Sequence, residues 1–157
     1  MYHLPLLVFY NSVTFPTVFA STALLRHIFI REQIQIVHAH AAFSTLGNDA
    51  LSLAPAMGLK SIFTDHSIFG FSDASAILTN KLFKYNLKNV AQAICVSHTS
   101  RENTALRARL PPDRISVIPN AVDTNVFVPA EQPARARCID GRITIVIMSR
   151  LVLRKGQ

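Results

Sequence analysis

The amino-acid sequence predicts an α/β fold in which helices pack against a parallel sheet. Three observations support this fold class. Short runs of β-branched residues recur along the chain, and several are apolar on both faces, as strands buried inside a parallel sheet must be. Segments with helical spacing of apolar residues lie between these runs. Strand and helix therefore alternate in chain order, which is typical of βαβ units and of a doubly wound sheet.

The predicted strands are defined by their apolar, β-branched composition. They cover residues 34–38, 61–65, 92–97, 115–118 and 143–148. We expect the first four to form the centre of one parallel sheet, with helices on its faces.

The first clear helical stripe lies between the first two of these strands. It consists of Phe43, Leu46, Ala50, Leu53 and Met57. Gly58 is suited to ending this helix, whereas Pro55 should kink or shorten its last turn.

Another helix is predicted after the third strand. Thr99 and Glu102 have the spacing of a capping box, in which each side chain bonds a backbone N–H at the start of a helix. We expect this helix to run toward Arg109 and to stop before Pro111 and Pro112.

The domain organisation follows from a change in composition after residue 128. Residues 129–141 carry Pro, Arg, Gln and Ala without apolar periodicity, which is typical of a linker. The apolar run 143–148 follows, but one strand cannot form a domain. We therefore expect a Rossmann-like domain over 1–128 and the start of a second domain over 142–157.

The charge balance favours an anionic partner. Sixteen Lys and Arg against nine Asp and Glu give a net charge of +7, which suits nucleic acid, a phosphorylated ligand or an acidic membrane surface. Two cysteines are too few for a disulfide framework or a four-cysteine zinc site. The sequence contains no run of 18 apolar residues, so no transmembrane helix is predicted. No Lys or Arg precedes Arg26, whereas a signal peptide begins with a positively charged region.

Polar residues follow two neighbouring strands at the ends where open α/β sheets bind ligands. His38 and His40 are two residues apart, so both imidazoles should face the same side. The pair suits metal ligation, hydrogen bonds to a polar substrate or a purely structural role, and no third metal ligand is evident nearby. His66 follows the next strand, where Asp65 could orient it toward a hydroxyl or phosphate. A polar turn is the alternative.

Two cations follow the last predicted strand. Arg150 offers a planar fork for phosphate oxygens, and Lys155 offers a mobile point charge. Gly156 allows close approach of the backbone or begins a helix whose amino terminus favours an anion. The segment has the outline of a diphosphate clamp, and an exposed basic loop is the alternative.

Three lysines share one stripe of a predicted helix, namely Lys81, Lys84 and Lys88. We expect Leu82, Phe83 and Val90 to turn away from them. Such a stripe is suited to an anionic lipid surface, and a solvated charged face is the alternative.

Taken together, these segments resemble the retaining nucleotide-sugar glycosyltransferases that have two Rossmann-like domains, the GT-B type. The most specific segments are 117–129, around Asn120 and Asp123, and 149–156. A closer resemblance, carried by residues 2–6, 63–71 and 78–82, is to the transferases that begin the synthesis of glycosylphosphatidylinositol (GPI) anchors. The usual glycine between Asn120 and Val122 is Ala121 here.

The resemblance implies an activity and a cellular place. It implies transfer of N-acetylglucosamine from UDP-N-acetylglucosamine to phosphatidylinositol at the cytoplasmic face of the endoplasmic reticulum membrane. The implied partners are these two substrates, other subunits of a transferase complex and the acidic membrane surface. Neither nucleic acid nor a metal or other cofactor is expected.

The resemblance also implies roles for single residues. Arg150 and Lys155 match ligands of the donor diphosphate, and His66 matches a histidine that faces the donor sugar as a catalytic residue. The other strand-end residues are expected to line the cleft, namely His38, His40 and Asp65.

Several family features are not in this sequence. These are a glycine-rich loop after the first strand, a two-glutamate motif for the donor sugar and a membrane anchor. We therefore expect a fragment that lacks the first strands of its amino-terminal domain and is inactive alone. Two other interpretations stay open: a non-catalytic remnant that binds lipid headgroups or partner subunits, and a transferase of the same fold with another acceptor.

Overall fold

The computed structural model describes residues 2–4, 8–10, 13–14, 18–42, 44–68, 74–129 and 145–146. The chain divides into two units, Met1–Asn120 and Ala121–Gln157. All helices and strands of the described residues belong to the first unit. In the second, the side chain of Asp123 accepts a hydrogen bond of 2.9 Å from the backbone N–H of Asn125 and so fixes a short turn.

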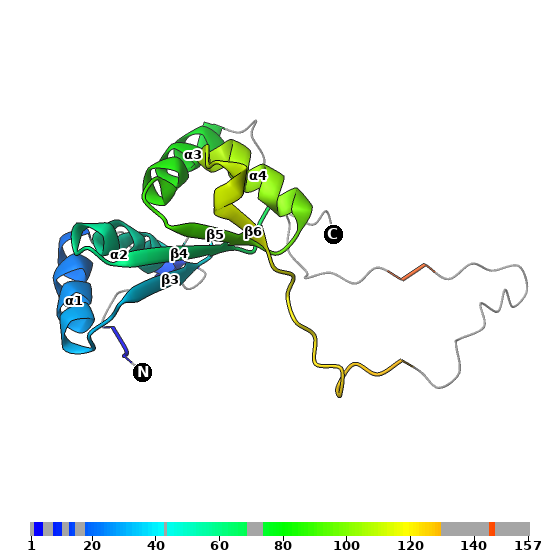
Figure 1. Ribbon diagram of the computed structural model, residues 1–157, viewed down its shortest axis with the longest axis horizontal. Helices are drawn as coiled ribbons and strands as arrows, with labels where there is room; N and C mark the ends of the chain where they lie inside the picture. The colour runs from blue at the N-terminus through cyan, green and yellow to red at the C-terminus, as the bar shows by residue number, and fades with distance from the viewer. Residues whose placement is uncertain are drawn as a thin grey trace, which may run out of the picture. The chain divides into compact units, whose positions relative to one another are not determined.

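Four parallel strands form the central sheet of the first unit. They are β3 (Ile36–His40), β4 (Lys60–Asp65), β5 (Gln92–Cys95) and β6 (Ile115–Val117), in the order β3-β4-β5-β6 (Figure 1). The predicted fold class and the pairing of the four central strands are confirmed. Two further short strands, β1 (Val8–Tyr10) and β2 (Val13–Thr14), form a separate antiparallel pair.

Helices α1 (Val18–Arg31), α2 (Thr45–Ala56), α3 (Ala74–Leu87) and α4 (His98–Ala108) accompany the sheet. Helix α2 connects β3 to β4, α3 connects β4 to β5 and α4 connects β5 to β6, so the chain crosses the sheet in one direction. Because such crossovers are right-handed, all three lie on one face (Figure 1). Helix α1 packs against α2. A 3₁₀ turn, Pro112–Arg114, leads into β6.

The core lies between the sheet and these helices. Phe63 is buried at its centre, with Ala39 and Ala93 beside it on the neighbouring strands. Its ring meets that of Phe83 on α3 edge to face, with centroids 5.4 Å apart. On the opposite face of β3, by contrast, Ile36 and the two histidines are exposed. The alternation of side chains thus gives the sheet one packed face and one accessible face.

The end of α2 agrees with the sequence analysis. Gly58 has a positive φ of 73°, and its N–H bonds the carbonyl of Pro55 at 3.0 Å. The N–H of Leu59 bonds the carbonyl of Ala54 at 2.9 Å, which completes a Schellman motif. Pro55 is accommodated in the last turn. Of the predicted stripe, only Phe43 lies outside the described residues.

The start of α4 differs from the prediction. Ser97, not Thr99, caps the helix: its hydroxyl accepts a hydrogen bond of 3.1 Å from the N–H of Ser100. Thr99 and Glu102 are therefore already inside the helix, and the predicted capping box is wrong by two residues. Ser97 and Thr99 both carry a hydroxyl, but only Ser97 lies before the helix, where its extended backbone (φ −157°) places the side chain over the first turn.

Replacing Ser97 with alanine is expected to lower the free energy of unfolding by about 1 kcal/mol, because one backbone N–H of the first turn loses its acceptor. The matched Thr99→Ala variant should change it by less than about 0.5 kcal/mol. Urea unfolding followed by circular dichroism would compare the two. A larger loss for Thr99→Ala would show that the cap is at the predicted position.

Several predictions concern residues outside the described part. One is the linker 129–141, of which only Pro129 is described. Another is the strand 143–148, of which only Ile145 and Val146 are described. Arg150 and Lys155 also lie outside the described residues. Among the described helices, none combines the length and the apolar content needed to cross a bilayer.

Candidate functional site

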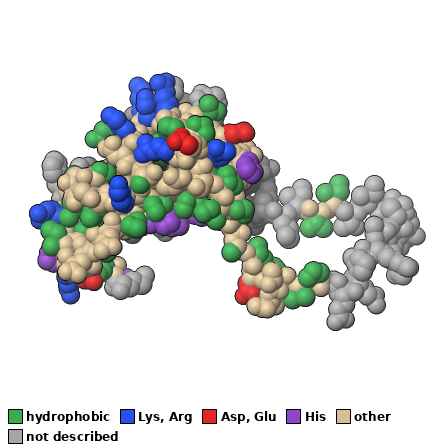
Figure 2. Space-filling view, viewed as in Figure 1, with side chains coloured by type: hydrophobic (Ala, Val, Ile, Leu, Met, Phe, Trp, Pro, Cys, Tyr) green, Lys and Arg blue, Asp and Glu red, His purple; other side chains and the backbone are tan. Residues whose placement is uncertain are grey.

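The candidate site lies where β3 and β4 end. The two strands are parallel and in register, with His40 opposite Thr64, so the residues that follow them meet at one edge of the sheet. Figure 2 shows histidine side chains along the sheet surface that faces away from the helices. The site is therefore on the accessible face.

Three imidazoles form a row at this edge. The rings of His38 and His40 have centroids 4.4 Å apart, and those of His40 and His66 are 5.4 Å apart and nearly parallel. Nδ1 of His40 lies 3.1 Å from Nε2 of His66, and Nε2 of His38 lies 2.7 Å from the hydroxyl of Thr64. The prediction that His38 and His40 share a side is confirmed, and His66 joins them.

The local sequence explains this arrangement. His38 and His40 are two residues apart on a strand, and the residue between them, Ala39, is buried against the helices. After the strand, Ala41 adopts a left-handed conformation (φ 65°), and its N–H bonds the carbonyl of Thr64 at 3.0 Å. This bond ties the ends of β3 and β4 together and keeps the imidazoles at hydrogen-bonding distance.

The row can donate and accept protons at its exposed edge. A contact between two ring nitrogens needs one proton, so one of His40 and His66 donates to the other. Partial burial lowers the pKa of His38, and the neighbouring His40 lowers it further, so the neutral ring of His38 is favoured. Neutral imidazoles of this kind are suited to hydrogen bonding and proton exchange with a substrate hydroxyl.

The row is not arranged as a metal centre. Within the described ranges, no group of three or more His, Cys, Asp or Glu side chains could hold a metal ion. The contact between His40 and His66 directs two ring nitrogens at each other instead of at a common point.

Asp65 does not line this site, contrary to the prediction. Its side chain is fully buried on the helix-covered face, where Oδ2 accepts a hydrogen bond from the Thr104 hydroxyl at 2.9 Å. Oδ1 accepts from the backbone N–H of Ser67 at 3.0 Å. Adjacent residues on a strand point to opposite faces, so the strand that presents Thr64 to His38 turns Asp65 into the core. The prediction that Asp65 orients His66 is therefore wrong. The His66 ring is oriented by its hydrogen bond with His40.

Burial raises the pKa of Asp65, although Thr104, Ser67, Arg107 and His66 all favour its charged form. A carboxyl that holds its proton more tightly in the folded chain stabilises that chain most below its ordinary pKa. We expect this contribution to be lost as pH rises through the folded pKa, and to be absent in Asp65→Asn. Urea unfolding of both proteins across the acidic range would test this. If the free energy of unfolding of the parent protein rose with pH relative to that of Asp65→Asn, the expectation would be contradicted.

The lysine stripe is exposed, as predicted. Lys81 and Lys84 lie on α3 and Lys88 lies in the turn after it, while Phe83 and Val90 are buried. Leu82 differs from the prediction, because 55% of it is exposed. Figure 2 shows basic side chains gathered over this part of the surface, on the helix side of the sheet.

Thr64 is a partner of His38 that was not predicted from the sequence. The signal was present in the strand-end sequence Thr64-Asp65-His66, but only the register of β3 against β4 identifies the partner. The proposed diphosphate ligands, Arg150 and Lys155, lie outside the described residues.

Comparison with known proteins gives the resemblance a firm basis. Residues 1–73 match the family model described as PIGA (GPI anchor biosynthesis). Over 156 residues, 99% of the chain, it is 53% identical to a phosphatidylinositol N-acetylglucosaminyltransferase subunit of Homo sapiens. The corresponding identity is 49% to the subunit of the same name in Arabidopsis thaliana and to the gpi3 subunit of the transferase in Schizosaccharomyces pombe. The chain spans 31–34% of the length of these relatives. The predicted resemblance is confirmed.

Proposed function

We propose that this chain, a relative of the phosphatidylinositol N-acetylglucosaminyltransferase subunits, is part of a retaining glycosyltransferase. The reaction is transfer of N-acetylglucosamine from UDP-N-acetylglucosamine to phosphatidylinositol, which begins GPI-anchor synthesis. One observation carries this proposal: identity of 44–53% over 99% of the chain to proteins named for the transfer of this sugar to this lipid.

The chemistry of the reaction fits the residues proposed for the site. A retaining sugar transfer passes through an oxocarbenium-like state, and the leaving group here is a nucleotide diphosphate. Fixed cations stabilise the charge that develops on that leaving group. We propose that Arg150 and Lys155 supply this charge in place of a metal ion.

His66 is the proposed residue that faces the donor sugar. Its Nε2 is engaged by His40, so Nδ1 is the nitrogen that would reach the sugar. The row supports this role because it lies exposed at the carboxyl end of the sheet, where ligands of open α/β folds bind. His40 is then a positioning residue for His66, and Thr64 holds His38 in the same row.

The place of action follows from the acceptor, which is a membrane lipid. We propose the cytoplasmic face of the endoplasmic reticulum membrane and assembly with other subunits of a transferase complex. The word subunit in the names of the relatives supports the assembly.

Peripheral attachment to an acidic membrane surface is part of this proposal. The exposed lysines of α3 support it, since a basic residue near an anionic surface strengthens binding. We expect Lys84→Gln to weaken flotation with anionic vesicles about fivefold. The matched control is Lys60→Gln, an exposed lysine at the start of β4, which should bind as the parent does. Vesicle binding that does not change with salt concentration or with the charge of the lipid would contradict the electrostatic attachment.

Radiolabelled sugar transfer to phosphatidylinositol by the full-length protein in its complex tests the proposed reaction. Labelled N-acetylglucosaminyl phosphatidylinositol is the expected product. Labelling of a soluble sugar acceptor alone would instead favour a transferase of the same fold with another acceptor.

A further inference from the structure

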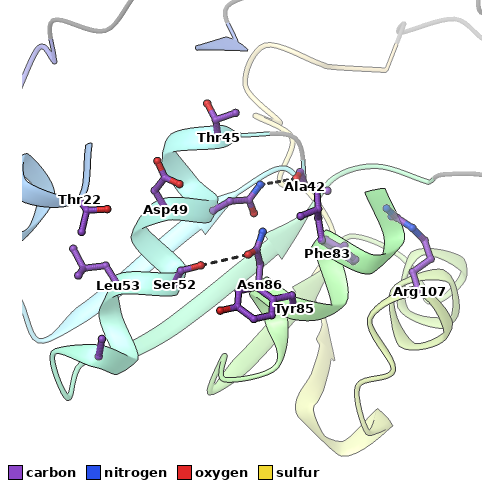
Figure 3. A pocket seen from close by; sticks show the side chains of 13 residues that line it. Thr22, Ala42, Thr45, Asp49, Ser52, Leu53, Phe83, Tyr85, Asn86 and Arg107 are labelled. Atoms are coloured by element: carbon purple, nitrogen blue, oxygen red, sulfur yellow. Dashed lines mark hydrogen bonds between the residues drawn. The ribbon is translucent and has the colours of Figure 1, made fainter. Parts of the chain in front are cut away.

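A groove of about 580 Å³ runs between α2 and α3, on the helix-covered side of the sheet (Figure 3). Its floor and walls are mainly apolar. The residues that matter for the argument are Ser52, Leu53, Ala56, Leu82, Phe83 and Tyr85. A volume of this size is within the range of pockets that bind small molecules.

The groove exists because α2 presents small side chains to α3. Ser52 and Ala56 are one turn apart on α2, and neither is large enough to fill the space between the helices. Across the groove, the Ser52 hydroxyl donates a long hydrogen bond of 3.3 Å to Oδ1 of Asn86 (Figure 3). This bond is the contact between α2 and α3 at this point, and the small side chains leave the space beside it open.

Exposed apolar side chains line the groove from α3, and exposed lysines lie on the same helix. Leu82 is 55% exposed and Tyr85 is 73% exposed, and both line the groove from α3. Lys81, Lys84 and Lys88 are exposed on the same helix and the turn after it. Helix α3 contains no acidic residue. An apolar cavity beside a row of cations is complementary to an anionic amphiphile.

We propose that the α2–α3 groove takes an acyl chain of an anionic membrane lipid while the α3 lysines contact phosphate headgroups. This inference rests on the membrane attachment proposed above and adds the site that holds the lipid.

A lipid suits the observations better than an amphipathic protein helix. Asp49, the acidic residue among those that line the groove, is already engaged, because its Oδ2 accepts a hydrogen bond of 2.6 Å from Ser21. Tyr85 lies between the apolar wall and the basic stripe, the position that tyrosine favours at the boundary of a bilayer. The lysines extend the basic surface along the helix, as headgroups spread along a membrane plane require.

The absence of tryptophan from the sequence allows a direct test in the full chain. Tyr85→Trp introduces a single tryptophan at the rim of the groove, which can be excited without the remaining tyrosines. Vesicles of phosphatidylinositol and phosphatidylcholine with brominated acyl chains should quench this tryptophan at least twofold more strongly than vesicles with unbrominated chains. Tyr2→Trp is the control, since Tyr2 contacts Glu32 just after the end of α1 and does not line the groove. The fluorescence of this control should be the same with brominated and with unbrominated vesicles.

Filling the groove tests the same inference by another route. Ala56→Phe in the Tyr85→Trp chain should remove more than half of the quenching while leaving salt-sensitive vesicle binding in place. Ala23→Phe, at an exposed alanine of α1, is the matched control. If Ala56→Phe alters the circular dichroism spectrum, Ser52→Phe fills the same space from the neighbouring turn.

Two results would overturn the inference. Vesicle-bound Tyr85→Trp that is not quenched would show that the lysines attach the chain without an acyl chain in the groove. A tryptophan that responds to another protein of the complex and not to vesicles would show that a protein helix occupies it. The proposed sugar transfer is tested separately, because Ala56→Phe in the full-length protein should transfer sugar to a water-soluble short-chain phosphatidylinositol at the parent rate.

Discussion

Alanine at both Arg150 and Lys155 is expected to lower sugar transfer by the full-length protein by at least about 10²-fold. Each substitution removes a cation proposed to face the leaving diphosphate. Because that charge develops as the sugar bond breaks, the loss should fall mainly on turnover. Radiolabelled transfer from UDP-N-acetylglucosamine to phosphatidylinositol measures it.

The control for this pair is Arg26→Ala, which removes an exposed cation from α1 and should leave transfer unchanged. Near-normal activity of the double variant would reject the diphosphate clamp and leave Arg150 and Lys155 as an exposed basic loop.

His66→Ala is expected to lower turnover by about 10²-fold while the fold is retained. The side chain is exposed at the carboxyl edge of the sheet, so its removal leaves no cavity in the core. His40→Ala should have a smaller effect, because it removes the hydrogen-bond partner of His66 and not the group that is proposed to face the sugar. His27→Ala, an exposed histidine on α1, is the control.

The expected order of these variants distinguishes catalysis from structure. A structural role for the row would make His40→Ala and His66→Ala equally harmful to thermal stability and leave the turnover of the remaining folded protein unchanged. A catalytic role for His66 predicts a normal melting temperature and lost turnover.

The fold was predictable because the helical spacing of apolar residues and the short β-branched runs of the strands are both clear in the sequence. The four central strands were expected within two residues of their observed ends, since short β-branched runs that alternate with helical segments indicate the strands of a parallel sheet. The end of α2 was predictable because Gly58 supplies the left-handed conformation that closes a helix. The start of α4 was not, because Ser97 and Thr99 offer the same hydroxyl and only the backbone selects one.

The candidate site was predictable in part for the same reasons. The period of two along a strand placed His38 and His40 together, and the parallel topology brought His66 beside them. Applied to Asp65, the period of two gives the buried position that the structure shows, one residue beyond Thr64. The exposure of Leu82 and the groove beside it depend on how far apart α2 and α3 pack, which no local pattern encodes.

A chimeric transferase tests the central claim most directly. In it, these 157 residues replace the segment of the human relative to which they are 53% identical, in cells that lack that relative. The chimera is expected to restore labelled N-acetylglucosaminyl phosphatidylinositol in microsomes, and His66→Ala in the chimera is expected to lower the product about 10²-fold at equal protein level. A chimera that assembles with its partner proteins yet forms no labelled lipid would contradict the account.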